Sequence, residues 1–361
     1  MNTVPTPAVS LRAEELEALA AEIKAIGAHL GFQQVGIADT DLQAAQASLD
    51  AWLQQGRHGE MDYMARHGTK RSHPEALLPG AVRVISARMD YFPESPSATQ
   101  ETLDDANRAY VARYALGRDY HKVLRGRLKR LGRAIGERVG EYGYRVCVDS
   151  APVLEKAIAE KAGLGWIGKH TNLINDKAGS WFLLGEILTD LPLPIDEPAT
   201  EHCGTCRACL DACPTGAIVA PFELDATLCI SYLTIELRGA IPVELRSAIG
   251  NRIFGCDDCQ IVCPWNKFAQ RTQEDDFTPR HALDTAELVH LFDWDERQWS
   301  TRTEGSALRR VGYEGWLRNI AVALGNAPST SEVISALRRR AEHPSALVRE
   351  HVAWALAQHG N

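Results

Sequence analysis

The feature that most constrains this chain is the segment CGTCRACLDACP at residues 203–214. Its cysteines follow the spacing C-x2-C-x2-C-x3-C, and a proline comes directly after the last cysteine. That spacing is the run of bacterial two-cluster ferredoxins, in which closely spaced cysteines hold one [4Fe–4S] cluster and the fourth ligates the other cluster. The segment therefore predicts iron–sulfur chemistry and electron transfer.

A second set of cysteines lies downstream and echoes the first; its members are Cys229, Cys256, Cys259 and Cys263. Its last cysteine is also followed by a proline, Pro264. Two half-runs of complementary spacing predict two clusters with crossed ligation. Cluster one then takes Cys203, Cys206, Cys209 and Cys263, and cluster two takes Cys213, Cys229, Cys256 and Cys259. Two zinc sites are the alternative, because zinc accepts C-x2-C pairs, but zinc explains neither the first run nor its echo. The ninth cysteine, Cys147, lies in an apolar strand and is expected to be an inert core thiol.

The composition is that of an ordinary globular protein. Of the 361 residues, 45% are hydrophobic and 24% are charged. No apolar run approaches the ~18 residues of a membrane span, and the start of the chain lacks the basic and then apolar regions of a secretory signal. We therefore expect a cytoplasmic monomer with no membrane partner. In a reducing compartment, nine cysteines favour cluster or metal ligation over a disulfide framework.

The chain divides into three predicted parts, which together give an α+β fold. Residues 1–195 alternate helices and strands and form an α/β domain, which ends at the proline-rich linker LPLPIDEP. The cysteines define a two-cluster ferredoxin-like domain at 196–270, and residues 271–361 are predicted to be a helical-repeat tail. The repeat rests on IAVAL at 320–324 and VAWAL at 352–356, because their offset of 32 residues suits paired-helix (HEAT-like) repeats. Two unrelated helices are the alternative.

Within the first part, apolar residues at three- and four-residue spacing indicate helices, and short apolar runs indicate strands. The first helix is expected to follow a cap at Ser10 and to end at Gly31. The other predicted helices and strands span 41–56, 120–139 and 152–162, and 34–39, 82–91 and 144–150. The segments 170–174 and 181–189, on either side of the turn-rich NDKAGS, are predicted to pair as a hairpin.

The α/β domain is expected to hold the electron acceptor, because a plain ferredoxin needs no such domain before its clusters. The glycine-rich nucleotide fingerprints G-x-G-x-x-G and G-x-x-x-x-G-K are absent from the sequence. The nearest approach to the corrinoid motif D-x-H-x-x-G is DYHKVLRG at 119–126, in which the glycine comes two places late. The spacing alone therefore does not name the acceptor.

Several longer blocks resemble the epoxyqueuosine reductase family and occur in that family's order. They are KRSHPEALLPGA, RYALGRDYHKVLRGRLKRL, VDSAPVLEKAIAEKAGLGWIGKHTNLI, IGNRIFGCDDCQIVCPWNK and VREHVAWALAQ, together with the first cysteine run. The resemblance implies a nitroreductase-like, reductive-dehalogenase-like α/β domain that binds cobalamin, which the two [4Fe–4S] clusters reduce. The implied substrate is epoxyqueuosine at the wobble position of a tRNA. The implied product is queuosine, so the reaction is the last step of queuosine biosynthesis.

The resemblance makes Asp149 the proton donor of this reaction. Removing the epoxide oxygen as water takes two electrons and two protons, so an acid must stand beside the departing oxygen. Burial against a corrin is expected to raise the pKa of the Asp149 carboxyl and to keep a proton available. The alternative is structural, because Asp149 or Ser150 could cap the following helix, with Pro152 in its first turn.

The resemblance also carries over the corrin contacts Arg71, Ala112, Asp149, Leu173, Leu184 and Ser231. Arg71 is expected to bind a polar edge of the corrin, and a solvated surface charge is the alternative. The two leucines could instead be plain core residues of their strands. His58, His121 and His170 are expected to be structural or substrate-facing rather than ligands of cobalt.

The net charge of −8 argues against a nucleic-acid substrate, but the distribution of charge matters more than its sum. Residues 108–133 carry a net charge of +8, and residues 302–340 carry +4. Solvated basic helices are the alternative explanation. The predicted tRNA contacts are Arg125, Arg127, Lys129, Arg130, Arg238, Arg309, Arg310 and Arg318.

Two other functions share part of this pattern. A corrinoid reductase acting on a small molecule, such as a reductive dehalogenase, would have the same clusters and cobalamin but would need no basic surface. An electron-carrier module would have the clusters and no cobalt. Under every reading the clusters need a low-potential electron donor, which the sequence does not identify.

Overall fold

The computed structural model describes residues 11–93 and 96–360, and it is built around one four-stranded sheet. The strand order is β1 (Gln34–Ala38), β2 (Arg83–Asp90), β7 (Phe182–Thr189) and β4 (Tyr144–Cys147), and all three pairings are antiparallel. The three strands predicted from short apolar runs at 34–39, 82–91 and 144–150 are confirmed as β1, β2 and β4. The predicted cap of the first helix, Ser10, lies outside the described residues.

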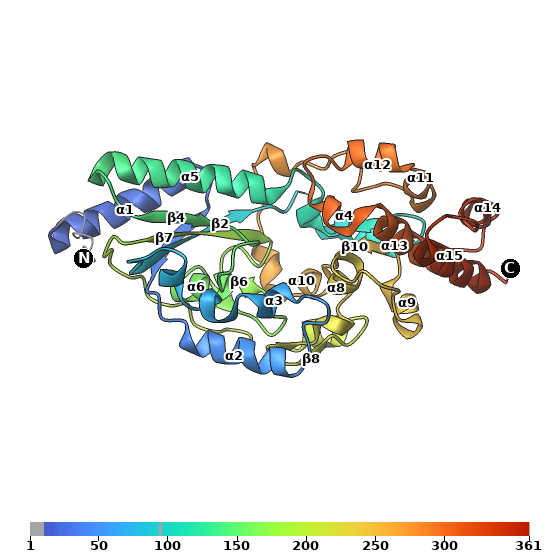
Figure 1. Ribbon diagram of the computed structural model, residues 1–361, viewed down its shortest axis with the longest axis horizontal. Coiled ribbons are helices and arrows are strands. Elements are labelled where there is room, and N and C mark those ends of the chain that lie inside the picture. Colours follow the sequence, from blue (N-terminus) through green and yellow to red (C-terminus); the bar gives the residue numbers. More distant parts are fainter. Residues whose placement is uncertain (1–10, 94–95, 361) are drawn as a thin grey trace, which may run out of the picture.

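Helices cover both faces of this sheet, as Figure 1 shows. On one face α1 (Ala13–His29) and α5 (Tyr120–Val139) bury leucines and isoleucines against the sheet. On the other face α6 (Glu155–Lys161) packs against β1, β2 and β7, with Ile158 and Ala159 buried in the shared core. Gly36 of β1 makes this packing possible, because an added Cβ would lie 2.0 Å from the carbonyl oxygen of Ala162. The domain is therefore a three-layer α/β/α arrangement.

The predicted hairpin between 170–174 and 181–189 is wrong. The short strand β6 (Leu173–Ile174) pairs with β5 (Trp166–Ile167), whereas β7 pairs along its length with β2 and β4. Asn175 turns the chain away from β6, because its side chain accepts from the amide of Lys177 and donates to the carbonyl of Leu164. A turn does follow β6, as predicted. It does not lead into a hairpin, because β2 and β4 occupy both edges of β7.

The remaining elements precede the cluster region, lie within it, or form the C-terminal part of the chain. Before and within the cluster region lie α2 (Gln43–Gln54), α3 (Tyr63–Arg66), α4 (Pro96–Asp104), β3 (Tyr110–Val111), α7 (Ala208–Ala212), β8 (Ile218–Ala220), β9 (Glu223–Leu224), α8 (Ile230–Ile235), α9 (Val243–Ile249), β10 (Arg252–Phe254) and α10 (Asp258–Ile261). The C-terminal helices are α11 (Leu288–Phe292), α12 (Glu296–Arg302), α13 (Gly312–Asn326), α14 (Ser331–Arg339) and α15 (Ala346–Gln358). Figure 1 places them at the end of the molecule opposite α1.

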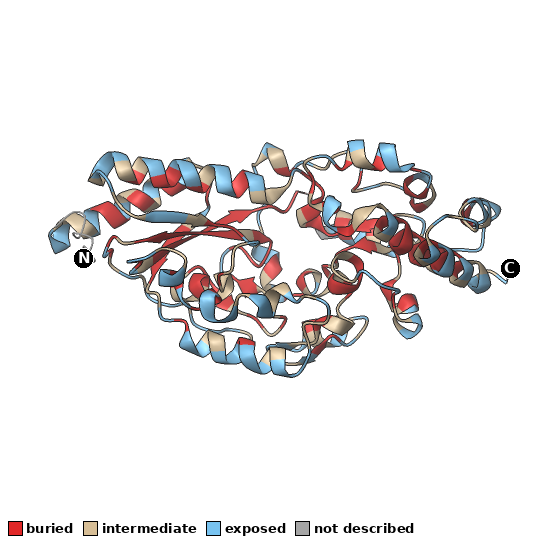
Figure 2. Cartoon of the chain, viewed as in Figure 1, coloured by how far each residue is buried: buried red, intermediate tan, exposed pale blue. Residues whose placement is uncertain are grey.

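The C-terminal helices share one hydrophobic core with a segment of the first part of the chain. Val111 and Leu116 pack in the same cluster as residues of α11, α13 and α15. Strand β3 pairs in parallel with β10, which lies between the cysteines of the second set. Figure 2 shows the resulting band of buried residues, which runs through α13. The predicted parts of the chain are therefore joined by packing as well as by linkers.

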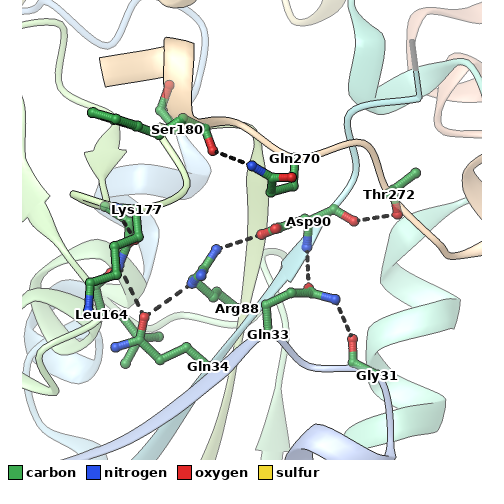
Figure 3. A network of polar contacts seen from close by, with 12 residues as sticks. Gly31, Gln33, Gln34, Arg88, Asp90, Leu164, Lys177, Ser180, Gln270 and Thr272 are labelled. Atoms are coloured by element: carbon green, nitrogen blue, oxygen red, sulfur yellow. Dashed lines mark hydrogen bonds and ion pairs between the residues drawn. The ribbon is translucent and has the colours of Figure 1, made fainter. Parts of the chain in front are cut away.

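A polar network ties the sheet to the segment that follows the cysteines (Figure 3). Arg88 and Asp90 at the end of β2 form an ion pair of 2.6 Å, and both side chains are less than a tenth exposed. Gln33 accepts from the backbone amide of Asp90, and Thr272 donates to its carbonyl oxygen at 2.8 Å. The hydrogen bond from Thr272 to the Asp90 backbone therefore ties the segment that follows the cysteines to the end of β2.

Arg318, predicted to contact tRNA, is a structural residue instead. Its side chain is fully buried within α13, and its guanidinium donates to the carbonyl oxygens of Leu233, Leu237 and Gly239 at 2.7 to 2.8 Å. It therefore holds the loop after α8 and is not available to a phosphate. A basic run in the sequence does not reveal which of its members are buried.

We expect Arg318→Met to destabilise the protein by about 3 kcal/mol or more, because three buried carbonyl oxygens lose their donors at ~1 kcal/mol or more each. The midpoint of thermal unfolding of the anaerobically purified protein should fall by about 5 °C or more. The exposed Arg297 of α12 provides the matched control, and Arg297→Met should shift the midpoint little. Equal midpoints for the two variants would contradict the assigned role of Arg318.

Candidate active site and cluster pocket

Asp149 lies just beyond the end of β4, where the backbone adopts a left-handed conformation with φ of +36°. Its carboxylate Oδ2 accepts from the hydroxyl of Tyr120 at 2.6 Å and faces Nε2 of His121 at 2.8 Å. It does not cap the next helix, because the cap residue of α6 is Leu154 and no side chain caps it. The capping alternative is therefore wrong, and a strained non-glycine backbone here is typical of a functional position.

His121 carries the positive charge that this carboxylate faces. Its Nδ1 lies 2.8 Å from Oδ1 of Asp119, which is the cap residue of α5. Burial opposes the charged ring, but the hydrogen bonds to Asp119 and Asp149 outweigh burial and raise the pKa of His121 to about 9. At neutral pH His121 is therefore an imidazolium that sits between two carboxylates.

Burial is expected to raise the pKa of the Asp149 carboxyl, but it is only one of two opposing effects. Burial acts in that direction, but the hydrogen bonds from His121 and Tyr120 outweigh it and lower the pKa of the carboxyl. The proton that the site holds therefore resides mainly on His121, one hydrogen bond from the carboxylate. The Asp149 side chain is 47% exposed, so it is also open to a reactant.

Two further carboxyl groups lie behind Asp149. Glu155 accepts from the backbone amide of Asp149, and burial together with the charge of Asp149 raises the pKa of Glu155 to about 7. Glu186 of β7 is fully buried, neither of its carboxyl oxygens has a hydrogen-bond partner, and burial raises its pKa well above the usual value. Protonated carboxyl groups at neutral pH are therefore expected close to the site.

Lys156 connects this site to the cysteines. Its Nζ donates to the carbonyl oxygen of Thr171 at 2.9 Å, and burial lowers its pKa. The charges of Cys259 and Cys229 act on the same ammonium group, as does the charge of Asp149. Lys156 therefore lies within electrostatic reach of Asp149 and of two cysteines assigned to cluster two.

The cysteines assigned to cluster one surround a cavity of about 330 Å³. All four of them, Cys203, Cys206, Cys209 and Cys263, line this cavity. Across the described residues, no group of three or more His, Cys, Asp or Glu side chains is arranged for a single metal ion. A space of this size suits a polyatomic cluster, whereas one zinc ion would draw its thiolates to about 2.3 Å.

The cysteines assigned to cluster two are brought together less completely than those assigned to cluster one. Burial raises the pKa of Cys259 well above its usual range, and the nearby charges of Cys229 and Cys213 add to this effect. The thiols of Cys229 and Cys213 therefore lie within electrostatic reach of Cys259, as does that of Cys209, which is assigned to cluster one. Cys256 is close in sequence, but its Sγ lies 2.8 Å from Oδ2 of Asp258. Cys147 is buried, and burial raises its pKa to about 11, which agrees with an inert core thiol.

Comparisons with known proteins match almost the full length of the chain. Residues 71–150 match the family model described as epoxyqueuosine reductase QueG, and residues 202–266 match a 4Fe-4S double cluster binding domain. The chain is 63% identical to the epoxyqueuosine reductase of Pseudomonas aeruginosa over 95% of each chain. It is 57% identical to that of Escherichia coli over 95% of this chain and 90% of the relative. The chain belongs to the epoxyqueuosine reductase family.

Solved structures of epoxyqueuosine reductases have the same fold. The enzyme from Bacillus subtilis, with its catalytic aspartate loop swung out of the active site, superimposes with a TM-score of 0.87 at 29% identity, covering 95% of this chain and 91% of that one. An epoxyqueuosine reductase with an epoxyqueuosine-modified tRNA stem-loop gives a TM-score of 0.86 at 28% identity and the same coverage. This reductase is thus an oxidoreductase with a double [4Fe–4S] domain.

The residues that the family resemblance assigns to the corrin are mostly buried in this reductase. Arg71 is only 7% exposed and donates to the carbonyl oxygens of Tyr63 and Met64, so the alternative of a solvated surface charge is wrong. Ala112, Leu173 and Leu184 are also buried. Ser231 is partly exposed and hydrogen-bonds to Cys229. Their contacts with a cofactor remain a prediction.

Two of the three histidines have defined hydrogen-bond partners, and the expectation that none is a ligand of cobalt stays a prediction. His121 is turned to Asp149, and His170 is buried with its Nδ1 accepting from the amide of Asn172. The sequence contained one signal near His121, the incomplete D-x-H-x-x-G motif, and its late glycine argued against a histidine ligand of cobalt. Tyr120, Glu155 and Lys156 were missed, because nothing in their spacing indicates that they meet Asp149.

Several predicted RNA contacts are engaged within the protein. Arg127 pairs with Glu274 and also donates to the carbonyl oxygen of Leu30. Arg310 forms two hydrogen bonds to Glu236, at 2.6 and 3.0 Å, and lies over the ring of Tyr63. The remaining predicted contacts lie at least partly at the surface, namely Arg125, Lys129, Arg130, Arg238 and Arg309.

Among the described residues, no helix is long and apolar enough to cross a membrane.

We expect Cys263→Ser to damage the cluster held by Cys203, Cys206 and Cys209, although it lies more than fifty residues downstream. Iron content should fall from about eight atoms per chain towards four, because one of the two clusters loses a ligand. Electron paramagnetic resonance of the reduced protein should retain one cluster signal. The buried Cys147 provides the control, since Cys147→Ser should keep all the iron. Loss of cluster two alone from the Cys263 variant would contradict crossed ligation.

Proposed function

We propose that this chain reduces the epoxide of epoxyqueuosine in the anticodon loop of a tRNA to give queuosine, with Asp149 as the proton donor. Electrons enter through the two [4Fe–4S] clusters and pass to cobalamin bound in the α/β domain. The observation that carries the proposal is the exposed Asp149 carboxylate, which faces a charged His121. The family membership supplies the substrate, and the site supplies the acid.

The residues around Asp149 fit a corrinoid. A corrin has an apolar ring face and a rim of amide groups, so its site needs apolar side chains and unoccupied polar atoms. Leu173 and Leu184 belong to an apolar core cluster of this domain, which would back the corrin site. Oε2 of Glu155 and both carboxyl oxygens of Glu186 are buried without a hydrogen-bond partner in the protein. Buried polar atoms normally have partners, so a polar ligand or water is expected beside them.

The chain's own contribution is to deliver protons. Epoxide, two electrons and two protons give an alkene and water, and bound cobalamin supplies the reducing equivalents at a nucleophilic cobalt. Asp149 is the group closest to solvent and reactant, and His121 at 2.8 Å returns a proton to it through Nε2. Asp119 hydrogen-bonds to Nδ1, the other ring nitrogen, and so keeps the imidazole ring of His121 oriented. Glu155, half-protonated near neutral pH, is a second source of the two protons required.

Asp149→Asn tests the proton donor. Asparagine keeps the size of the side chain and its hydrogen-bond acceptor but cannot give up a proton. We expect turnover of an epoxyqueuosine stem-loop to fall about 100-fold or more, the usual scale for a general acid. Cobalamin content and both clusters should be unchanged, as measured by cobalt and iron analysis and by the visible spectrum. Near-normal turnover would remove Asp149 from the mechanism.

The same proton path predicts a pH dependence. The pKa of His121 is about 9, so its proton is present below that value and is lost as the pH rises through it. Turnover at saturating stem-loop should therefore decline on the alkaline side near pH 9. Glutamine at position 121 keeps hydrogen bonds but does not titrate, so His121→Gln should lower turnover and abolish this alkaline limb. An unchanged limb in that variant would assign it to another group.

The RNA part of the proposal rests on charge. A wobble base lies in a single-stranded loop, so it can leave its stack and enter a pocket without melting a duplex. Arg238 donates to the carbonyl oxygens of Arg310 and Val311, and the charges of Arg310 and Asp149 act on one another. Basic residues of the C-terminal part therefore lie close to the proposed acid. Phosphates flanking the extruded base would meet them there.

We expect the isolated anticodon stem-loop to bind with an affinity that falls about tenfold or more between low and moderate salt, because phosphate contacts release counterions. The double variant Arg309→Gln, Arg310→Gln should bind more weakly, with the spectrum of the reduced cofactor unchanged. Arg339→Gln is the matched control, since Arg339 pairs with Asp293 away from the site. Salt-independent binding, or no binding at low salt, would exclude this mode of recognition.

A further inference from the structure

The two cysteine sets differ in how they face solvent. Cluster one lies at an open cavity, and one of its four cysteines, Cys206, is exposed at the surface. The cysteines assigned to cluster two are all half-buried, and none of them is exposed. Cluster one is therefore the cluster with a cysteine open to an electron carrier in solvent.

The mouth of the cluster-one cavity has an unusual lining for this chain. Its charged lining residues are Lys169 and Lys267, with His202 beside them, and no carboxylate lines the cavity. The chain as a whole carries a net charge of −8. Aromatic side chains line the same cavity, among them Trp265 and Phe268, which is 37% exposed.

Two carboxylates close in sequence to the cysteines of the first run have partners within the protein. Glu201 accepts from the backbone amide of Cys203, and Asp211 pairs with Arg207 at 3.6 Å. On the cationic side, Lys169 donates to the carbonyl oxygens of Gly204 and Cys206 and so stabilises the cluster loop. Lys267 is exposed and lies 4.8 Å from the centre of the Phe268 ring. Lys267 is therefore the cation available to a partner.

We propose that this surface, formed by Lys169, His202, Trp265, Lys267 and Phe268, is the docking face for an acidic one-electron carrier protein. The proposal rests on the proposed function, because it requires cluster one to accept electrons. An exposed lysine beside an exposed aromatic ring, in a lining without carboxylates on an otherwise acidic chain, attracts a partner of opposite charge and repels like-charged proteins. Transient redox encounters need only a small interface of this kind.

The test measures electron entry directly rather than epoxide turnover. Reduced flavodoxin, an acidic flavoprotein, is mixed with the oxidised holoenzyme in an anaerobic stopped-flow instrument, and bleaching of the cluster absorbance gives the rate. Lys267→Glu should slow this reduction about tenfold or more at low salt, and the difference from the unmodified enzyme should shrink at high salt as charges are screened. Reduction by dithionite, a small molecule that needs no docking face, should be unchanged.

Two further variants keep the test decisive. Arg297→Glu makes the same change of charge on α12, outside the cavity lining, and should leave the flavodoxin rate unchanged. Lys267→Gln removes the charge without reversing it, and should give a smaller loss even if the glutamate variant loses iron. The proposal is overturned if Lys267→Glu behaves like Arg297→Glu, or if the two reductants slow equally. It is also overturned if the tRNA stem-loop blocks reduction by flavodoxin, since the surface would then belong to RNA.

Failure of this proposal and failure of the proposed function are distinguishable. With dithionite as reductant, the Lys267 variants should still convert the epoxyqueuosine stem-loop at the normal rate. If the stem-loop is not converted by the unmodified enzyme, the proposed function fails, whatever the rate of electron entry. If conversion is normal and the Lys267 variants accept electrons from flavodoxin normally, only the docking face is wrong.

Discussion

The interaction on which the site depends is the pairing of the Asp149 carboxylate with the imidazolium of His121. It joins the end of β4 to the first turn of α5, and it requires both the left-handed backbone at Asp149 and the cap residue Asp119. Helix α5 holds its place because its leucines pack on the sheet, so the position of the charge pair follows from hydrophobic packing. The acid–base chemistry is therefore set by the same core that stabilises the domain.

The electrostatics of the site come from opposing effects of similar kind. Burial favours the neutral form of every group here, yet Asp149 and His121 are both charged because each satisfies the other. Glu155 and Glu186 lack such partners, so burial prevails and raises their pKa values. One carboxylate that is ionised and two carboxyl groups that hold protons thus lie in one neighbourhood. An enzyme that must deliver two protons for each epoxide can use such a set.

The structure also brings the cysteines of the first run together with a distant one. Cys203, Cys206, Cys209 and Cys263 line one cavity, together with Lys169 and Lys267. The return of Cys263, late in the chain, to this cavity supports crossed ligation. Thr272, which follows the cysteines, donates to the backbone carbonyl of Asp90 at the end of β2. The cluster region is therefore tied to the sheet that carries Asp149.

The sequence by itself determined the cluster chemistry, because ligand spacing is local and the C-x2-C-x2-C-x3-C-P run has few other uses. It also determined most helices and strands, including α5, whose predicted span of 120–139 is the observed one. Only the tertiary structure decided which charges are available, since Arg318 is buried among carbonyl oxygens and Arg127 is paired with Glu274. It likewise decided that β7 pairs with β2 and β4, and that His121 meets Asp149. These outcomes depend on contacts between residues distant in sequence, which periodicity and spacing do not encode.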